Sequence, residues 1–236
     1  MLFAQFGQPA DYEQIGQIAQ KYNLLVLEDA AQGFGGNING KMACSFGDAA
    51  TTSFFPAKPL GCYGDGGAVF TDSDELANLL KSIRIHGKGT EKYDNVRIGL
   101  NSRLDTIQAA ILLPKLKAFK EYELQKRNEI ACRYTESLKG KYTTPFVPNN
   151  IKSSWAQYTL LLNNEEERNS LQSKLKEHNI PSMIYYPKPL HLQTCYKDLE
   201  YKCRLINSEN ASKCVLSLPM SPWMDECDII KILKFL

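Results

Sequence analysis

In the first half of the chain, the spacing of apolar residues changes repeatedly between a helical and a strand-like pattern. Apolar residues recur at helical spacing over 10–22, whereas 24–27 is a short, wholly apolar run typical of a buried strand. The run Pro9-Ala10-Asp11 provides a helix start and Asn23 a helix stop. The same alternation predicts strands at 49–54 and 67–71 and a helix at 73–85. This order of elements predicts an α/β fold with a mostly parallel sheet.

The second half of the chain has a different pattern of predicted elements. It begins with an amphipathic helix over 103–119, interrupted by Pro114, and a further helix over 121–139, and this pair carries the chain between domains. Beyond Gly140 the predicted elements are a strand at 157–162, a helix at 165–178, a strand at 182–186, a loop and helix within 196–212, and a helix at 225–235. We therefore expect two domains, a large α/β domain over 1–120 and a smaller α+β domain over 121–236.

Composition narrows the class of protein. The 236 residues include 28 Lys and Arg against 26 Asp and Glu, and a net charge of +2 gives no reason to expect nucleic acid or an anionic membrane surface as partner. No apolar stretch is long enough to span a membrane, and the N-terminus lacks a signal-peptide pattern. The seven cysteines are odd in number, scattered and without a CxxC pair, so we expect no metal site and a reducing, cytoplasmic location.

Two charged positions stand out against this background. The apolar run at 24–27 ends in Glu28-Asp29, and the carboxyl end of a buried parallel strand is where α/β folds place ligands, which makes Asp29 a site candidate. Lys58 lies between this acidic strand end and the glycine-rich run at 64–67. A lysine amine that is held neutral can act as a nucleophile and form a Schiff base. The alternative is that Lys58 is an ordinary solvated surface charge.

Several ordered motifs resemble one family. The runs EDAAQ at 28–32, SFFPAK at 53–58 and GCYGDGG at 61–67 are similar to those of the DegT-type nucleotide-sugar aminotransferases. The resemblance extends through further segments at 86–87, 99–105 and 108–111, and more weakly at 185–187 and 218–220. It implies a pyridoxal 5′-phosphate (PLP) enzyme with the aspartate aminotransferase fold, in which 1–120 is part of the PLP-binding large domain. The run at 64–67 is neither GxGxxG nor GxxxxGK[ST], which argues against a nicotinamide-dependent or P-loop protein.

The resemblance implies a role for four residues of the large domain. Lys58 holds the cofactor as an internal aldimine and then serves as acid and base for the proton shift. Asp29 pairs with the pyridine nitrogen, Gln32 hydrogen-bonds the ring oxygen, and Ser53 binds the phosphate. The alternatives from the residues alone are a helix N-cap for Asp29, a solvated side chain for Gln32 and a polar strand residue for Ser53.

The resemblance also implies a homodimer with composite active sites. Asn101 resembles a residue that reaches the cofactor phosphate of the neighbouring subunit, and Arg103 one that meets the substrate there. Tyr185 and Tyr186 resemble substrate-binding residues of the smaller domain. The alternative for Arg103 is an intersubunit or helix-start salt bridge, and His86 is either a structural cap or a residue that approaches the site.

The motifs around Lys58 and Arg103 are most similar to those of enzymes that aminate UDP-linked 3-keto sugars, including the 3-keto uronate. The resemblance then implies an amino group transferred from glutamate to a nucleotide sugar, in the synthesis of surface polysaccharide such as lipopolysaccharide, with Arg103 recognising the sugar carboxylate. Two departures affect the substrate pocket. The run Gln32-Gly33-Phe34-Gly35 lacks a histidine that many relatives have, and Tyr185 stands where uronate enzymes often have one. Lys58 argues against the family's dehydratases, which have histidine at that position.

This chain starts just before the motif at 7–11. Members of the family that it resembles have a substantial segment before that motif. That segment supplies a phosphate loop, a ring-stacking aromatic residue and several strands. We therefore expect that the N-terminal part is missing from this chain. The alternative function is that of a truncated, inactive fragment that acts only as a partner of an intact subunit.

Overall fold

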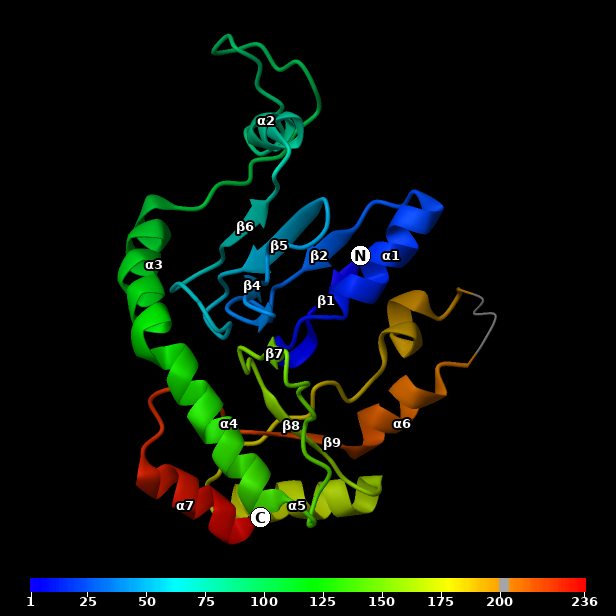
Figure 1. The fold of residues 1–236 in the computed structure, drawn as a ribbon, viewed down its shortest axis with the longest axis vertical. Coiled ribbons are helices and arrows are strands. Elements are labelled where there is room, and N and C mark those ends of the chain that lie inside the picture. The colour runs from blue at the N-terminus through cyan, green and yellow to red at the C-terminus, as the bar shows by residue number, and fades with distance from the viewer. Residues whose placement is uncertain (200–203) are drawn as a thin grey trace. The chain divides into compact units, whose positions relative to one another are not determined.

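The computed structural model describes residues 1–199 and 204–236, and the chain divides into two compact units (Figure 1). The first comprises Met1–Gln125 and Val147–Ala156, and the second comprises Lys126–Phe146 and Gln157–Leu236. Part of the predicted loop and helix within 196–212, including Cys203, lies outside the described residues. Each described sheet is formed by strands of one unit alone.

A four-stranded mixed sheet forms the centre of the first unit. Its strand order is β1-β2-β5-β6, with bounds Leu2–Phe3, Leu27–Asp29, Ala49–Ser53 and Gly67–Phe70. The first three strands are mutually parallel, and β6 runs antiparallel to β5. Asp29 pairs with Phe3 on one side and with Thr51 on the other. The predicted α/β fold with a mostly parallel sheet is confirmed.

The first helix begins and ends at the predicted residues, but the strand after it does not. Helix α1 (Tyr12–Tyr22) is capped by Asp11, whose side chain accepts a hydrogen bond from Gln14 N at 3.0 Å, and ends at Asn23 in the left-handed conformation. The prediction of a strand from residue 24 is wrong, because Leu24 N still donates to Ala19 O of the helix. Leu25 is 87% exposed, so the buried strand begins only at Leu27.

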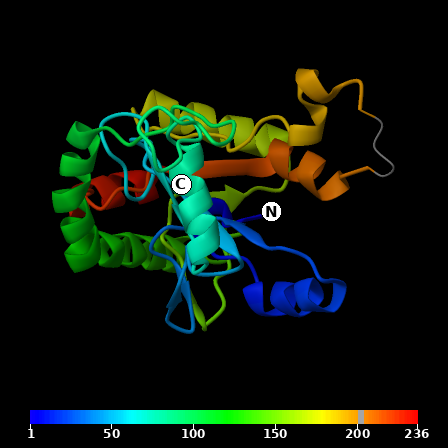
Figure 2. The same cartoon turned by 90° about the horizontal axis from the view of Figure 1, so that it is seen from above.

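Helix α2 (Asp74–Ile83) follows β6 and starts at Ser73, whose hydroxyl accepts from Leu76 N at 3.2 Å. Figure 2 shows α2 as the turquoise helix near the centre, with the loop 84–105 leading from it to α3. A second, small sheet of this unit joins β4 (Lys41–Met42), β3 (Asn37–Ile38) and β7 (Ile151–Lys152). These two-residue strands were not predicted, because they are too short to show a periodic pattern.

Three helical segments follow one another without a break between 106 and 138. They are α3 (Thr106–Ala118), a π-helical turn η2 (Phe119–Glu123) and α4 (Leu124–Leu138). The predicted interruption at Pro114 is wrong, since α3 continues past it. Leu112 and Phe119 lie on either side of the proline, and both pack in one core cluster with Phe54, Leu60 and Cys62. Their burial offsets the backbone hydrogen bond that the proline removes.

The described residues of the second unit form an antiparallel pair of strands and three further helices. Strand β8 (Tyr158–Leu161) pairs with β9 (Val215–Leu218), and the helices are α5 (Glu165–Glu177), α6 (Ile206–Cys214) and α7 (Glu226–Phe235). The predicted strand at 182–186 is wrong, because only Met183 forms a bridge, to Ser217. Proline at 181 and 187 donates no ladder hydrogen bond and limits the pairing.

Three short 3-10 segments complete the described elements, at Gln5–Gly7, Leu190–Leu192 and Thr194–Tyr196. Within residues 1–199 and 204–236, no helix has both the length and the apolar character that crossing a membrane requires.

Candidate active site

Two of the predicted residues lie at one edge of the sheet in the first unit. Asp29 ends β2 and Ser53 ends β5, and because these strands are parallel neighbours, both side chains lie at their carboxyl ends. The half-buried Asp29 uses Oδ1 to accept a hydrogen bond from Ala31 N at 3.0 Å. Residues 31–35 form turns, so Asp29 caps no helix. Its Oδ2 has no hydrogen-bond partner among the described residues, which leaves it available to a ligand.

Gln32 is fixed beside this edge and is not the solvated side chain of the alternative interpretation. Only 3% of the residue is exposed, and its Oε1 accepts a hydrogen bond from Phe6 N at 2.7 Å. The backbone oxygen of Gln32 accepts from the buried hydroxyl of Ser154 at 2.9 Å. These contacts join segments far apart in the sequence, so the position of Gln32 depends on the packing of the whole unit.

The loop that carries Lys58 is closed by backbone hydrogen bonds at its base. Phe54 N donates to Gly66 O and Cys62 N donates to Phe54 O, both at 2.8 Å. The buried thiol of Cys62 lies 3.1 Å from both Phe54 O and Gly64 O. Inside the loop, Lys58 N donates to Phe55 O at 2.9 Å. The chain thus leaves β5, presents Lys58 and returns to β6 within a fixed turn.

Lys58 and Ser53 have groups that this packing leaves unused. Lys58 is half-buried, and within the described part of the chain its Nζ forms no ion pair or hydrogen bond. The hydroxyl oxygen of Ser53 accepts from Phe55 N at 3.2 Å, so its own hydrogen can still be donated. An amine, a carboxylate oxygen and a hydroxyl donor therefore occur at one strand edge. These three groups fit a cofactor that carries an aldehyde for the amine, a basic ring nitrogen for the carboxylate and a phosphate for the hydroxyl.

Asn101, Arg103 and His86 form a second group, in the loop between α2 and α3. Arg103 Nε donates to Asn101 Oδ1 at 3.1 Å, and Arg103 Nη2 lies 3.4 Å from His86 Nε2. No carboxylate of a described residue pairs with Arg103 within this chain, so a salt bridge at the start of α3 is excluded. Neither Asn101 nor Arg103 hydrogen-bonds Asp29, Ser53 or Lys58 of the same chain within residues 1–199 and 204–236.

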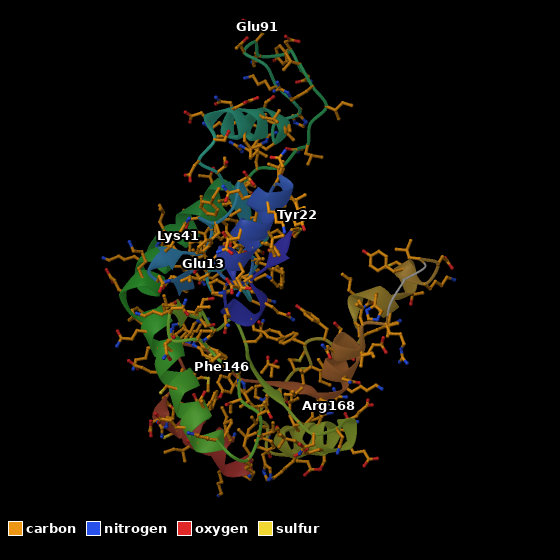
Figure 3. All side chains as sticks on the ribbon, turned by 45° about the vertical axis from the view of Figure 1, so that its right-hand side comes forward. Glu13, Tyr22, Lys41, Glu91, Phe146 and Arg168 are labelled. Atoms are coloured by element: carbon orange, nitrogen blue, oxygen red, sulfur yellow. The ribbon has the colours of Figure 1, made fainter. Side chains whose placement is uncertain are left out.

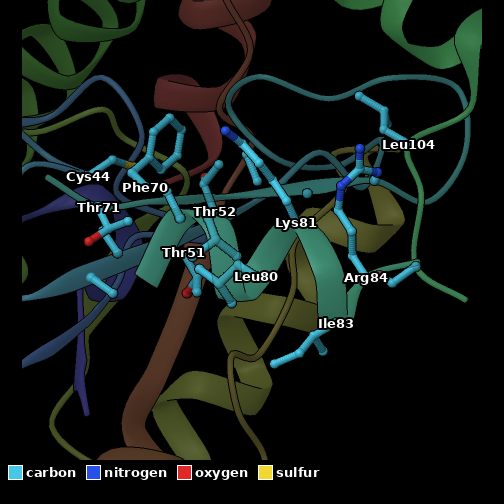
Figure 4. A pocket seen from close by; sticks show the side chains of 18 of the residues that line it. Cys44, Thr51, Thr52, Phe70, Thr71, Leu80, Lys81, Ile83, Arg84 and Leu104 are labelled. Carbon is cyan, nitrogen blue, oxygen red and sulfur yellow. The ribbon is translucent and has the colours of Figure 1, made fainter. Parts of the chain in front are cut away.

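Asn101 and Arg103 also line a cavity of about 1350 Å³ within the first unit. Strands β5 and β6 contribute one wall and α2 another, and Figure 4 shows Leu80 and Lys81 of the helix beside Thr51 and Thr52, with Arg84 directly after the end of the helix. Asp29, Gln32 and Lys58 do not line this cavity. The sequence analysis did not single out Lys81 or Arg84, because neither belongs to a motif.

Tyr185 and Tyr186 belong to the second unit. Their rings meet edge to face with centroids 5.5 Å apart, and Tyr186 is 51% exposed. Of the other histidines, His178 stacks on Phe235 with ring centroids 3.6 Å apart, and His191 Nε2 lies 3.4 Å from Glu209 Oε1. No group of three or more His, Cys, Asp or Glu residues in the described part of the chain is arranged to hold a metal ion.

Glu28 is a buried carboxylate that the sequence analysis treated only as part of the acidic strand end. It is 0% exposed, and its two carboxylate oxygens accept from Cys44 N and Phe46 N, each at 3.0 Å. Burial raises the pKa of Glu28, and these two backbone hydrogen bonds oppose the shift. Side chains alternate along a strand, so Glu28 points away from the face that bears Asp29. That alternation was the available signal for a structural rather than a catalytic carboxylate.

Comparison with known proteins agrees with this arrangement. The model of the DegT/DnrJ/EryC1/StrS aminotransferase family matches residues 1–236. The chain belongs to this family. A relative from Pseudomonas aeruginosa, described as UDP-2-acetamido-2-deoxy-3-oxo-D-glucuronate aminotransferase, is 47% identical over 95% of this chain and 61% of its own length. The resemblance inferred from the motifs is thereby confirmed.

Solved structures of the family share the fold. A DegT/DnrJ/EryC1/StrS aminotransferase from Brucella abortus has a TM-score of 0.94 and 49% identity, covering 99% of this chain and 62% of that one. NtdA from Bacillus subtilis, with bound cofactor PMP, has a TM-score of 0.88 and 30% identity, covering 99% and 54%. The family's aminotransferases are PLP-dependent. The chain spans less than two thirds of the length of these relatives.

Proposed function

We propose that this protein is a PLP-dependent aminotransferase that moves an amino group from glutamate to the keto group of a UDP-linked 3-keto sugar. The observation that carries the proposal is the edge formed by β2, β5 and the lysine loop, where Asp29, Ser53 and Lys58 each have an unused donor or acceptor. Transfer of the amino group converts glutamate into 2-oxoglutarate and the ketone into an amine. In this proposal residues 1–120 are the cofactor-binding domain and 121–236 the smaller domain.

Each residue at this edge has a distinct task in the proposal. When bound, PLP supplies an electron sink for the charge that develops on the substrate carbon. Asp29 Oδ2 accepts the hydrogen of the protonated ring nitrogen, the Ser53 hydroxyl donates to the phosphate, and Gln32 holds the ring oxygen. Lys58 would hold the cofactor covalently through Nζ, and once the amino donor has displaced it, the freed amine would accept and return the proton that moves during transfer. An amine already positioned beside both carbons needs no diffusion.

We further propose a homodimer with composite sites, and the second group of residues supports it. In this chain Asn101 and Arg103 are hydrogen-bonded to each other but not to Asp29, Ser53 or Lys58, which supports a role in the site of a neighbouring subunit. Asn101 uses Oδ1 for Arg103, so its amide N–H groups are available to a phosphate. Arg103 binds an anionic group of the nucleotide sugar, and Tyr185 and Tyr186 contact the same substrate.

The 47% identity to the 3-oxo-glucuronate aminotransferase supports a uronate as substrate, with its carboxylate bound by Arg103. Products of this class serve in the synthesis of surface polysaccharide, and we propose the cytoplasm as the place of reaction.

Lys58→Ala provides the direct test of the site. Wild-type protein saturated with PLP should show a visible absorbance band of lysine-bound cofactor, and borohydride reduction should fix the cofactor on the peptide that contains Lys58. The variant should lose both signals, whereas Lys21→Ala, which changes an exposed lysine of α1, should keep them. A wild-type protein that binds no PLP under these conditions would contradict the proposal for this chain.

A second proposal is that the chain is inactive alone and acts only as a partner of an intact subunit. Co-expression with a full-length relative and size-exclusion chromatography tests this function. Separate elution of the two chains argues against it.

A further inference from the structure

The guanidinium group of Arg103 is held from two sides within its own chain. Its Nε donates to Asn101 Oδ1 at 3.1 Å, and its Nη2 lies 3.4 Å from His86 Nε2. Its Nη1, with two further N–H donors, has no partner among the described residues. Arg103 is exposed, and an exposed arginine that is held by nothing samples many rotamers and loses more entropy when it binds a ligand.

We propose that His86 is a positioning residue for Arg103: its Nε2 accepts a hydrogen bond from Arg103 Nη2 and, together with Asn101, fixes the guanidinium plane so that Nη1 remains for an anionic group of the substrate. This inference rests on the proposed function, which gives Arg103 its ligand. His86 itself touches neither substrate nor cofactor in this role.

The backbone places His86 for this contact. His86 adopts the left-handed conformation with φ 58°, and its N–H donates to Leu100 O at 2.9 Å. The neighbouring Ile85 forms a β-bridge with Asn101, which brings the two ends of the loop together. The next residue must be glycine, because a Cβ on Gly87 (φ 73°) would lie 1.7 Å from Arg97 O. A left-handed backbone costs free energy at a residue other than glycine. At His86 this conformation places the imidazole in contact with Arg103.

The contact determines the chemical state of the imidazole. Arginine only donates, so His86 Nε2 must carry the lone pair and the hydrogen must sit on Nδ1. A doubly protonated imidazole would place two cations 3.4 Å apart, and their repulsion would break the contact between His86 and Arg103. A histidine free in solvent has no such constraint on its tautomer.

The contact is tested without any ligand by nitrogen-15 spectroscopy of histidine-labelled protein. The chain has only three histidines, so the His86 signals are assigned from a His86→Asn variant. At a pH where the ring is neutral, we expect an unprotonated Nε2 and a protonated Nδ1 in the wild type. Arg103→Leu should remove this preference. A wild-type His86 with hydrogen mainly on Nε2 overturns the proposal.

The functional consequence is tested with two probes that differ in one carboxylate, UDP-glucuronate and UDP-glucose, bound to the PLP-saturated protein. His86→Asn tolerates the left-handed conformation but is too short to reach Arg103, and it should weaken UDP-glucuronate binding roughly tenfold while UDP-glucose changes less than about twofold. His86→Gln, which again offers an acceptor at similar reach, should restore most of the affinity. A rescue by glutamine is not expected from a merely structural histidine.

The two proposals fail in different ways. If Arg103→Leu does not distinguish the two probes, the substrate role of Arg103 is wrong, and the spectroscopic result still decides whether His86 holds it. If Arg103→Leu weakens UDP-glucuronate binding and His86→Asn does not, His86 is not a positioning residue.

Discussion

At the scale of single residues, the adjacent carboxylates of Glu28 and Asp29 lie in different surroundings because successive side chains of a strand point to opposite faces. Glu28 is enclosed and hydrogen-bonded to Cys44 N and Phe46 N, whereas Asp29 keeps one oxygen without a partner among the described residues. Both are acidic residues in one motif, and they differ in how the surrounding residues pack against them. Their own burial raises the pKa of Cys44 and of Tyr12, and the charge of the neighbouring Glu28 adds a smaller contribution in the same direction.

The thiol of Cys44 should be unreactive. Burial, with a further contribution from Glu28, raises its pKa to about 12, so very little reactive thiolate exists at pH 8. Treatment with iodoacetamide at pH 8, followed by peptide mass spectrometry, should therefore modify the exposed Cys195 and Cys227 well before Cys44. Equal rates at all three sites would show that Cys44 is neither buried nor influenced by Glu28.

The ion pair between Arg133 of α4 and Glu226 of α7 should stabilise the second unit only where Glu226 is ionised. The hydrogen bond from Arg133 lowers the pKa of Glu226, so the contribution is present above the usual pKa of glutamate and is lost as the pH falls through the lowered pKa. Glu226→Gln should lower the melting temperature at pH 7 and have no effect at strongly acid pH.

The matched control is Glu13→Gln, an exposed glutamate of α1 that has no ion-pair partner among the described residues. It should change the melting temperature little at either pH. A Glu226→Gln effect that persists unchanged in acid contradicts the ion-pair interpretation.

At the scale of elements, the sequence identifies best those helices that start with their own capping residue. Asp11, Ser73 and Asp225 each accept a hydrogen bond from the third residue after them, and the three predicted helices begin beside them. Local pattern is less reliable for strands, because pairing is a property of distant residues. The apolar residues 24–26 and the segment 182–186 have strand-like composition and lack continuous ladders.

Adding a single methyl group at Gly61 should destabilise the loop that carries Lys58. A Cβ on Gly61 would lie 2.6 Å from Phe55 O and 2.7 Å from Pro56 O, both backbone atoms that the closed turn fixes. Gly61→Ala should lower the free energy of unfolding by about 1–3 kcal/mol, measured with urea, and should weaken PLP binding.

Gly16→Ala is the control for this prediction. A Cβ there meets no atom within 4 Å, and the position lies inside helix α1. The free energy of unfolding should rise by about 0.5–1 kcal/mol with no effect on PLP binding. If both substitutions have the same effect, the loop is less constrained than its contacts indicate.

At the scale of the whole molecule, the loop after α2 presents apolar side chains to solvent within the first unit. Ile98 is 99% exposed, Tyr93 88% and Leu100 64%, and Figure 3 shows Glu91 at the tip of this loop. Such a cluster is typical of a surface that another protein chain covers. In the proposed homodimer this loop carries Asn101 and Arg103 toward the neighbouring subunit.

Ile98→Asp should therefore shift the protein from dimer toward monomer in size-exclusion chromatography with light scattering. The charge would have to be buried without a partner at the interface. Ile230→Asp, at an exposed apolar position of α7 in the second unit, is the control and should leave the mass unchanged. A wild-type protein that is monomeric at all concentrations, or an Ile98→Asp variant that remains dimeric, contradicts the proposed interface.

The sequence by itself determined the family and the α/β class, and it nominated the residues to which we assign cofactor chemistry, because these depend on motifs and on local helix signals. Tertiary structure decided which of their atoms are left for a ligand. Gln32 is fixed by Phe6 N, which lies 26 residues away, and Glu28 is enclosed by the turn at 44–46. The contact between His86 and Arg103 crosses 17 residues and needs a left-handed backbone. Such contacts depend on how segments that are far apart in the sequence pack together. The pattern of residues along the chain does not specify the distances between those segments.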